Sequence, residues 1–259
     1  MHTVIAELWK FRGLADALIR RHVATRYRGS LFGFVWSLLN PLCLMAIYTL
    51  VFHYYMRFNG GDQYHLMVFA GLLPWLWTAS ALSEGTSSIV GSGHLITKSM
   101  FPAHILPFVS VSSSLVHFAL ALPVLALFIV GGGYSIPWTW CFLPGLVMVH
   151  AALLFGLVLA LSAVNVFFRD VQHLVGNLLT FLFFLCPVVY PPSAVPERFR
   201  FLIDLNPFAL LTESYQQVLI QGLVPGMHHF LYLIVVAALA CVLGAVIHEH
   251  YRERFAEAL

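Results

Sequence analysis

Long apolar stretches alternate with short polar segments along most of the chain. A helix that crosses a bilayer needs roughly 20 apolar residues. Six stretches qualify or nearly qualify, and they run over residues 31–54, 66–83, 105–130, 143–168, 173–190 and 230–248. No Asp, Glu, Lys or Arg lies in the central part of any of them. The pattern predicts an all-α integral membrane protein with six transmembrane helices in a single transmembrane domain over residues 1–259.

The N-terminal segment, residues 1–30, has a different periodicity. Apolar and histidine positions recur at helical spacing, namely Leu8, Phe11, Ala15, Leu18 and His22. A basic amphipathic helix of this kind is typical of the membrane interface, where it lies in the plane of the bilayer. The alternative is an ordinary helix packed on a partner. We expect an interfacial helix here.

The segment 191–229 is too polar to span a membrane. Nearly forty residues without secondary structure would be unusual, so we expect short helices on the outer side. Within it, "FALLTESYQQVLIQG" is amphipathic and ends at Gly222. We predict that these helices re-enter the membrane where protein shields their backbone. Residues 230–248 then form helix six, and 249–259 form a cytoplasmic tail.

The positions of Lys and Arg predict the orientation, because cytoplasmic loops are enriched in these residues. With the N-terminus inside, the cytoplasmic set is Lys10, Arg12, Arg20, Arg21, Arg26, Arg28, Lys98, Arg169, Arg252 and Arg254. Only Arg57, Arg198 and Arg200 remain outside. Both termini of this multi-pass membrane protein are therefore predicted to be cytoplasmic.

Composition excludes a soluble protein. Charged residues make up 9% of the 259 residues and hydrophobic residues 60%, whereas a soluble domain carries about 25% charged residues. The segment Gly91–Ser99 resembles a phosphate-binding loop but lacks its glycine spacing. No catalytic or metal-binding motif is recognisable either. We therefore expect no enzyme activity, no metal and no cofactor on this chain, and no nucleic acid among its partners.

Aromatic residues are dense in the predicted spans. Belts of aromatic residues at the membrane interface explain many of them. Stacking on sugar rings explains the rest, because an aromatic face accepts the apolar face of a pyranose. The candidates for lining a channel are Tyr48, Phe52, Trp75, Trp77, Phe183 and Tyr190. His117 and His150 also lie within spans, where we expect packing or hydrogen bonds between helices.

Four sequence blocks resemble permeases of polysaccharide-exporting ABC transporters of the ABC-2 type, in particular the Wzm-type O-antigen exporters. The blocks follow one another in the family order and cover most of the chain. They are "TRYRGSLFGFVWSLLNPLCLMAIYTLVF" (25–52), "LITKSMFPAHILPFVSVSSSLVHF" (95–118), "NVFFRDVQHLVGNLLTFLFFLCPVVYP" (165–191) and "LNPFALLTESYQQVLIQG" (205–222).

The resemblance implies a homodimer of this subunit with two copies of a separate nucleotide-binding ATPase subunit, which holds ATP and Mg²⁺. It also implies export of a polysaccharide linked to undecaprenyl diphosphate, as in O-antigen and lipopolysaccharide biosynthesis. The implied fold has an interfacial helix, six transmembrane helices and outer re-entrant helices before the last. The dimer would form a channel lined partly by helices one and five.

In such permeases the loop between helices two and three forms a coupling helix that docks on the ATPase. Here the loop is "GSGHLITKSMFP", residues 91–102. The apolar contacts would come from Leu95, Ile96, Met100 and Phe101, the polar rim would include Lys98, and Pro102 would end the turn. The alternative is a tight turn whose lysine binds anionic lipid.

Two further cationic sites are expected at the cytoplasmic surface. Arg26 and Arg28 either reach lipid phosphates or bind the diphosphate of the carrier, since guanidinium groups pair bidentately with phosphate. Helix one would move with the interfacial helix to open a lateral gate for the lipid carrier, and Trp36 would lie at this gate. Arg169 and Asp170 would form a local ion pair or a second ATPase contact.

Other functions stay open at this point. A capsule or teichoic-acid exporter would have the same architecture. A membrane enzyme acting on polyprenyl-linked glycans would need acidic or histidine groups that converge in the membrane, and the predicted spans lack carboxylates. A passive channel has neither a ring of charges nor a carbonyl filter to support it.

Overall fold

The computed structural model describes residues 7, 9–26, 28, 29, 32–57, 61, 63–98 and 101–259, without the side chains of 34, 97, 98 and 256. These described residues form helices and no strands. The α-helices are α2 (Arg12–Arg26), α3 (Trp36–Tyr48), α4 (Tyr64–Thr86), α5 (Ser88–Gly91), α6 (Gly93–Lys98), α7 (Ile105–Gly131), α8 (Leu143–Phe167), α9 (Val171–Leu185), α10 (Phe201–Asp204), α11 (Pro207–Gln216), α12 (Met227–Arg252) and α13 (Phe255–Ala258). The short helical segments are η1 (Gly33–Val35), η2 (Thr49–Tyr55), η3 (Trp138–Phe142), η4 (Pro192–Ala194), η5 (Glu197–Phe199) and η6 (Gln217–Gln221).

Five of these described helices are long and apolar enough to cross a membrane. They run over Trp36–Tyr55, Tyr64–Thr86, Ile105–Gly131, Trp138–Phe167 and Met227–Arg252, and they coincide with five of the six predicted spans. The stretch 173–190 instead contains α9, an apolar helix of 15 residues. At 1.5 Å per residue it is about 22 Å long, short of the roughly 30 Å of a bilayer core. A sixth span therefore stays a prediction.

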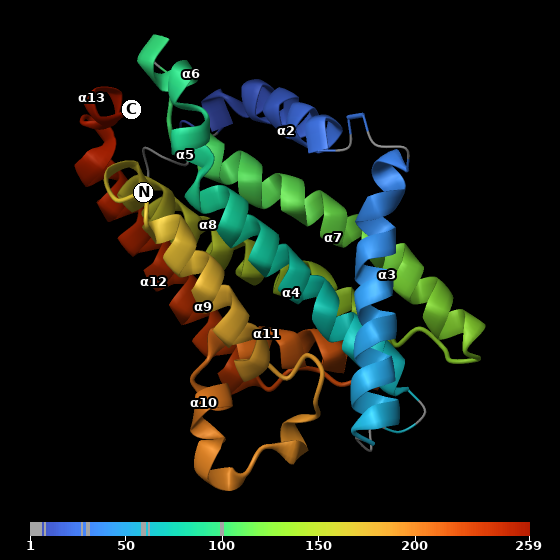
Figure 1. Ribbon diagram of the computed structural model, residues 1–259. Coiled ribbons are helices and arrows are strands. Elements are labelled where there is room, and N and C mark those ends of the chain that lie inside the picture. Colours follow the sequence, from blue (N-terminus) through green and yellow to red (C-terminus); the bar gives the residue numbers. More distant parts are fainter. Residues whose placement is uncertain are drawn as a thin grey trace.

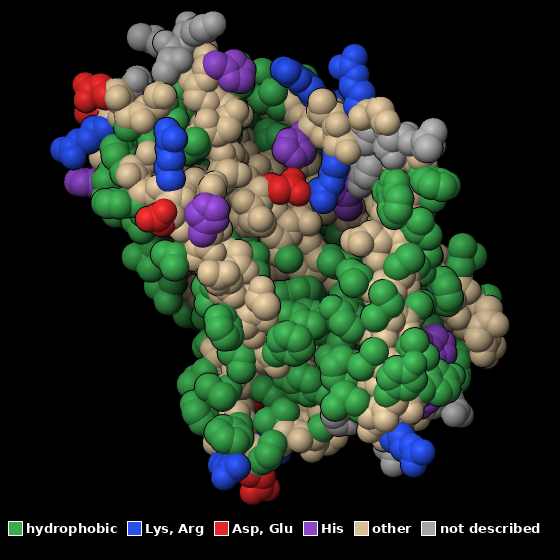
Figure 2. Space-filling view, in the orientation of Figure 1, with side chains coloured by type: hydrophobic (Ala, Val, Ile, Leu, Met, Phe, Trp, Pro, Cys, Tyr) green, Lys and Arg blue, Asp and Glu red, His purple; other side chains and the backbone are tan. Residues whose placement is uncertain are grey.

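The long helices run side by side in alternating directions, so that connections gather at two ends of the bundle (Figure 1). The C-terminus lies at one end, here called the termini end, together with the N-terminal helix α2 and with α5, α6 and α13 (Figure 1). The connections at the other end, the far end, include α10. Figure 2 shows charged and histidine side chains at these two ends and mostly hydrophobic side chains between them. This is the distribution that a bilayer imposes on a protein that crosses it.

Helix α4 is the centre of the bundle. In an apolar stretch of 18 residues within α4, 72% of the residues are buried. The corresponding value for the span that begins with α3 is 11%. The α4 side chains Phe69, Leu72 and Trp77 belong to a single large hydrophobic core with parts of α7, α8, α9, α11 and α12. Helix α3 packs on one side of α4 and leaves most of its own apolar surface uncovered.

The closest helix pair is α8 with α12. A side chain on Gly156 would collide with the backbone of Ala240 and Cys241, and one on Gly244 would collide with the backbone of Gly156. Small residues let membrane helices approach this closely, where packing rather than the hydrophobic effect holds helices together. The Cys241 thiol also donates a hydrogen bond to the carbonyl of Ala152 at 3.1 Å. The α8–α12 pair is therefore a rigid part of the bundle.

Helix α11 and the π-helical turn η6 confirm the short helices predicted before the last span. They end at Gly222, whose φ of +68° is the left-handed conformation that glycine tolerates. Side chains of η3 satisfy the irregular backbone of η6. The Thr139 hydroxyl donates to the carbonyl of Val218 at 2.7 Å, and the Trp140 indole N–H donates to that of Leu219 at 3.0 Å.

A buried polar group joins three helices in the core. His150 of α8 lies 2.9 Å from the Thr78 hydroxyl of α4 and 3.4 Å from the Tyr215 hydroxyl of α11. Each polar atom in a low-dielectric interior needs such a partner. His150 thus makes hydrogen bonds between helices, as the sequence suggested, and Tyr215 brings α11 into the interior of the bundle.

Helix α2 packs across α7 at the termini end (Figure 1). Ala15 is buried there against Ile105 and Val109 of α7, with Phe11 and Leu18 partly buried beside it. The predicted apolar stripe is therefore confirmed at these positions, while Leu8 lies outside the described residues. Its contact is with another helix of the same chain.

Candidate functional site

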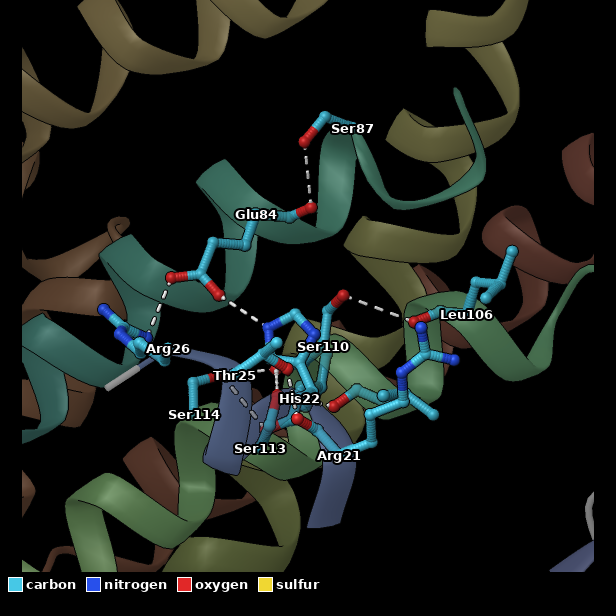
Figure 3. A network of polar contacts seen from close by, with 12 residues as sticks. Arg21, His22, Thr25, Arg26, Glu84, Ser87, Leu106, Ser110, Ser113 and Ser114 are labelled. Carbon is cyan, nitrogen blue, oxygen red and sulfur yellow. Dashed lines mark hydrogen bonds and ion pairs between the residues drawn. The ribbon is translucent and has the colours of Figure 1, made fainter. Parts of the chain in front are cut away.

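An ion-pair cluster joins the end of α2 to the end of α4 (Figure 3). Glu84 accepts from both partners: Arg26 Nη1 lies 2.9 Å from Oε1, and His22 Nε2 lies 3.2 Å from Oε2. All three side chains are about one-third exposed. A carboxylate in the last turn of a helix is unfavourable, because the helix dipole places partial negative charge at that end. Here the guanidinium of Arg26 compensates it, and His22 adds a second polar contact, so this contact, which we call the latch, orients α2 on the bundle.

Beside the latch lies a cavity of about 270 Å³ between α3, α4, α7 and the end of α2. Its polar lining comes from three predicted spans and from α2, and consists of Arg26, Ser37, Asn40, Ser80, Ser114 and His117. Its apolar lining consists of Trp36, Pro41, Leu73, Leu76, Trp77, Phe118 and Ala121. Polar side chains inside a membrane segment are costly and commonly functional. We call this the latch cavity.

The latch cavity contains two of the three predicted gate residues. Arg26 and Trp36 both line it, and Arg26 is also held by Glu84. Arg28 is exposed in the connection from α2 to α3. Its backbone N–H donates a hydrogen bond to the carbonyl of Thr25 at 3.3 Å. The structure thus brings Arg26 and Trp36 together and leaves Arg28 outside the cavity.

Sequence reasoning missed several residues of this site. Glu84 lies just past the predicted end of helix two, at 83, whereas α4 continues to Thr86. His22 was assigned only to the apolar stripe of the N-terminal helix. The available signal was that Glu84 is the one carboxylate between residues 63 and 100. Such an isolated charge at the end of an apolar span requires a partner.

The predicted channel aromatics divide into groups. Tyr48, Trp75 and Phe183 line a second cavity of about 350 Å³ between α3, α4 and α9, here called the aromatic cleft. The ring centroid of Phe183 lies 5.4 Å from that of Tyr48 and 5.6 Å from that of Trp75. Phe52 stacks edge-on with Tyr48 at 6.4 Å. These four side chains come from three helices and form one aromatic surface.

Trp77 and Tyr190 lie elsewhere. Trp77 is 2% exposed and stacks on Phe118 in the core, with its indole N–H 3.3 Å from the carbonyl of Val111. Only part of its surface reaches the latch cavity. Tyr190 follows α9 and donates a hydrogen bond to the carbonyl of Phe184 at 2.8 Å. The full set of predicted aromatics therefore does not line one surface within a single chain.

The predicted coupling loop, residues 91–102, begins at the last residue of α5 and contains α6. Helix α6 projects beyond the end of α4 (Figure 1). Ile96 belongs to a hydrophobic cluster that also contains Ile89 and, from the C-terminal segment, Phe255 and Leu259. Leu95 is partly exposed. Met100 lies outside the described residues, and so does the side chain of Lys98. The loop is therefore braced by the C-terminus of the same chain.

Phe101 is partly buried at the end of the coupling loop. It packs against a hydrophobic cluster that contains Ala15 of α2 and Ile105 and Val109 of α7. Pro102 itself is partly buried at this turn. The end of the coupling loop thus shares a hydrophobic cluster with α2 and α7, and an ATPase contact through Phe101 stays a prediction.

The expected ion pair between Arg169 and Asp170 is absent from the described structure. Both residues are exposed in the connection from α8 to α9, beside Phe168, which is 63% exposed. Asn165 stabilises this turn instead, since its side-chain oxygen accepts from the Gln172 N–H at 3.2 Å. An ATPase contact at this connection stays a prediction.

Comparisons with known proteins find relatives that cover most or all of the chain. Residues 14–220 match the ABC-2 type transporter family. The chain is 36% identical over 261 residues to the O-antigen export system permease protein RfbA of Myxococcus xanthus, covering 100% of both chains. A protein of the same name from Klebsiella pneumoniae is 29% identical over 248 residues, 95% of each chain. The polysialic acid transport protein KpsM of Escherichia coli is 19% identical over 247 residues, 92% of this chain and 93% of that protein.

Proposed function

Because this chain belongs to the ABC-2 type transporter family, we propose that it is the permease subunit of an ATP-driven exporter of O-antigen-type polysaccharide. The substrate would be carried on undecaprenyl diphosphate and would cross the bacterial inner membrane. The observation that carries the proposal is the similarity over the whole chain to an O-antigen export permease. Five helices able to cross a membrane support it.

The energy would come from a separate nucleotide-binding subunit, with ATP and Mg²⁺ bound there. Helix α6 projects from the bundle and is the proposed contact with that subunit (Figure 1). Two packing routes lead from it into the permease. Ile96 shares a hydrophobic cluster with the C-terminal segment, and Phe101 shares one with α2 and α7. A displacement of α6 would therefore reach both α12 and α2.

The termini end is the proposed cytoplasmic side. It carries α2, α6 and the C-terminus, which together hold most of the Lys and Arg residues outside the apolar spans. The far end would then face outward, with the short helices α10 and α11. Helix α11 would be re-entrant, because its Tyr215 is buried beside His150 of α8.

The proposed channel lies between two copies of this chain. Helix α9 presents an uncovered apolar stripe, with Leu174, Phe181 and Phe184 each at least 60% exposed. Helix α3 is similarly uncovered. The aromatic cleft lies between these two helices. Stacking on its rings would let a sugar polymer slide without a fixed register.

Carrier recognition would take place at the latch cavity, where Arg26 and Trp36 meet, with Arg28 on the approach to it. A guanidinium group donates two parallel hydrogen bonds to phosphate oxygens, and this geometry suits a diphosphate. The cavity lies at the proposed cytoplasmic end, where a lipid-linked glycan made in the cytoplasm would arrive.

The test is reconstitution with the nucleotide-binding subunit encoded in the same organism. We expect the two proteins to co-purify as a complex with two copies of each chain, and expect lipid-linked glycan to stimulate its ATPase activity. Nucleotide hydrolysis by the permease alone, or ATPase activity indifferent to glycan, would refute the proposal.

A second candidate is export of a capsular polysaccharide by the same architecture. The similarity to a polysialic acid transport protein favours it, although at 19% identity rather than 36%. Supplying the reconstituted complex with each class of lipid-linked glycan separates the two candidates.

A further inference from the structure

The latch cavity has the chemistry of a phosphate site that is closed by its own counter-ion. Arg26 lines the cavity and is at the same time paired with Glu84. One guanidinium thus faces both an internal carboxylate and an open space of about 270 Å³. An anion entering that space would compete with Glu84 for the same N–H donors.

Further polar groups of the cavity suit an anion. Asn40 of α3 and Ser80 of α4 carry N–H and O–H donors, and His117 of α7 lies close enough to Arg26 and Glu84 to interact with both electrostatically. Ser114 uses its own donor on the carbonyl of Ser110 at 2.6 Å. The donors therefore come from α2, α3 and α4, and an anion bound to them would connect these three helices.

The apolar part of the lining indicates what the anion is attached to. Pro41, Leu73, Leu76 and Phe118 line the same cavity, which lies between helices that cross the membrane. A free inorganic ion would gain nothing from these side chains, whereas a lipid would place its phosphate near Arg26 and its first carbons against them.

We propose that the latch cavity binds the phosphate or diphosphate group of a lipid, and that Glu84 is the counter-ion which this group displaces from Arg26. Displacement leaves Glu84 with His22 alone and replaces the direct ion pair between α2 and α4 by contacts through the bound anion. Lipid entry thereby changes how α2 is held on the bundle, and α2 shares a hydrophobic cluster with Phe101 of the coupling loop. The proposal rests on the proposed function only for the identity of the lipid.

Binding can be measured by isothermal titration calorimetry on the full chain in phosphatidylcholine nanodiscs. The probes are farnesyl diphosphate, farnesol and dioleoyl phosphatidylglycerol. We expect farnesyl diphosphate to bind and farnesol not to bind. Competition by phosphatidylglycerol would assign the site to membrane phospholipid, and its failure to compete would assign the site to an isoprenoid diphosphate. Equal binding of farnesol, or no binding of either anionic probe, would overturn the proposal.

Two variants separate the cavity from the latch. Glu84→Gln keeps the side-chain shape and removes the competing charge, so farnesyl diphosphate should bind about tenfold more tightly. Ser80→Phe places a large apolar side chain in the cavity and keeps both members of the ion pair, so it should abolish binding. The matched control is Asp16→Asn, which breaks the exposed Asp16–Arg20 pair on α2 and should leave binding unchanged. Unchanged affinity in Glu84→Gln, or retained binding in Ser80→Phe, would contradict the proposal.

Export distinguishes this inference from the proposed function. If the wild-type complex binds farnesyl diphosphate but exports no polysaccharide, the proposed function fails and the phosphate site stands. If Ser80→Phe loses binding and still exports at the wild-type rate, the phosphate site is not the carrier site and the proposed function stands.

Discussion

Gly156 of α8 faces Gly244 of α12 with backbone against backbone, and no space for a methyl group remains between them. The contact lies inside both helices, in the pair that joins the C-terminal span to the rest of the bundle. It is a demanding packing contact, and the first prediction concerns it.

Gly156→Ala should destabilise the protein by about 1–3 kcal/mol, the usual cost of forcing an extra carbon into a well-packed interior. The added carbon would meet main-chain atoms of Ala240 and Cys241, which cannot move aside as a flexible side chain would. Gly145→Ala on the same helix has open space around its Cβ. This control should be neutral or slightly stabilising, because alanine favours helix. Thermal unfolding in detergent compares the two, and equal melting temperatures would contradict the prediction.

Phe101→Asp should separate ATP hydrolysis from export. The carboxylate would be placed against Ala15 and Ile105, and we expect α2 to open more easily by about 1–3 kcal/mol. Hydrogen exchange should become faster in α2 and stay unchanged in α8. The complex should still hydrolyse ATP, but without export.

Phe199→Asp is the control for this variant, since Phe199 is 44% exposed at the far end. It should export normally. Normal export by Phe101→Asp would show that the contact between the coupling loop and α2 carries no signal.

Thr139→Val should destabilise the turn η6. The substitution keeps the shape of the side chain and removes the donor to the carbonyl of Val218. A buried carbonyl that loses its partner costs about 1–3 kcal/mol. Thr180→Val is the matched control, because the Thr180 hydroxyl is exposed and bonds within its own helix to Gly176. Faster proteolysis or exchange confined to 217–222 in the Thr139 variant is the expected result, and identical behaviour of the two variants would exclude this role.

Stability should decline in mild acid through His104. Burial lowers the pKa of His104 below its ordinary value of 6.5, Arg252 lowers it further, and Glu7, 3.5 Å away, opposes this. The folded protein therefore holds His104 neutral, whereas the unfolded chain takes up a proton below pH 6.5. The corresponding stability is present above that pH and is lost as the pH falls below it.

The measurement is the melting temperature between about pH 7 and about pH 5, the range in which histidine ordinarily titrates. His104→Gln should show a shallower decline than the wild type. His94→Gln, at an exposed position on α6, should follow the wild type. If His104→Gln declines as steeply as the wild type, His104 does not contribute to the pH dependence.

Much of the architecture follows from the sequence alone. Five spans, the amphipathic stripe at Phe11, Ala15 and Leu18, and the helix end at Gly222 are all properties of neighbouring residues. Hydropathy over about 20 residues sets the position of a segment along the membrane normal, and periodicity over a few turns sets which side of a helix is covered. These signals are local, so no knowledge of the partner helices is needed to use them.

The tertiary structure decided how these segments meet. Nothing in its hydropathy distinguishes α4 as the central helix, because α7, α8 and α12 are at least as apolar. Glu84 contacts His22, which lies 62 positions away in the chain, and Phe101 joins a hydrophobic cluster formed by α2 and α7. Apolar segments in a membrane have no preferred neighbours by hydrophobicity alone, since lipid and protein are equally apolar. Shape and isolated polar groups decide the partners instead. Gly156 is an example of shape, and His150 and Glu84 are examples of polar groups. Their contacts form only once the helices lie side by side.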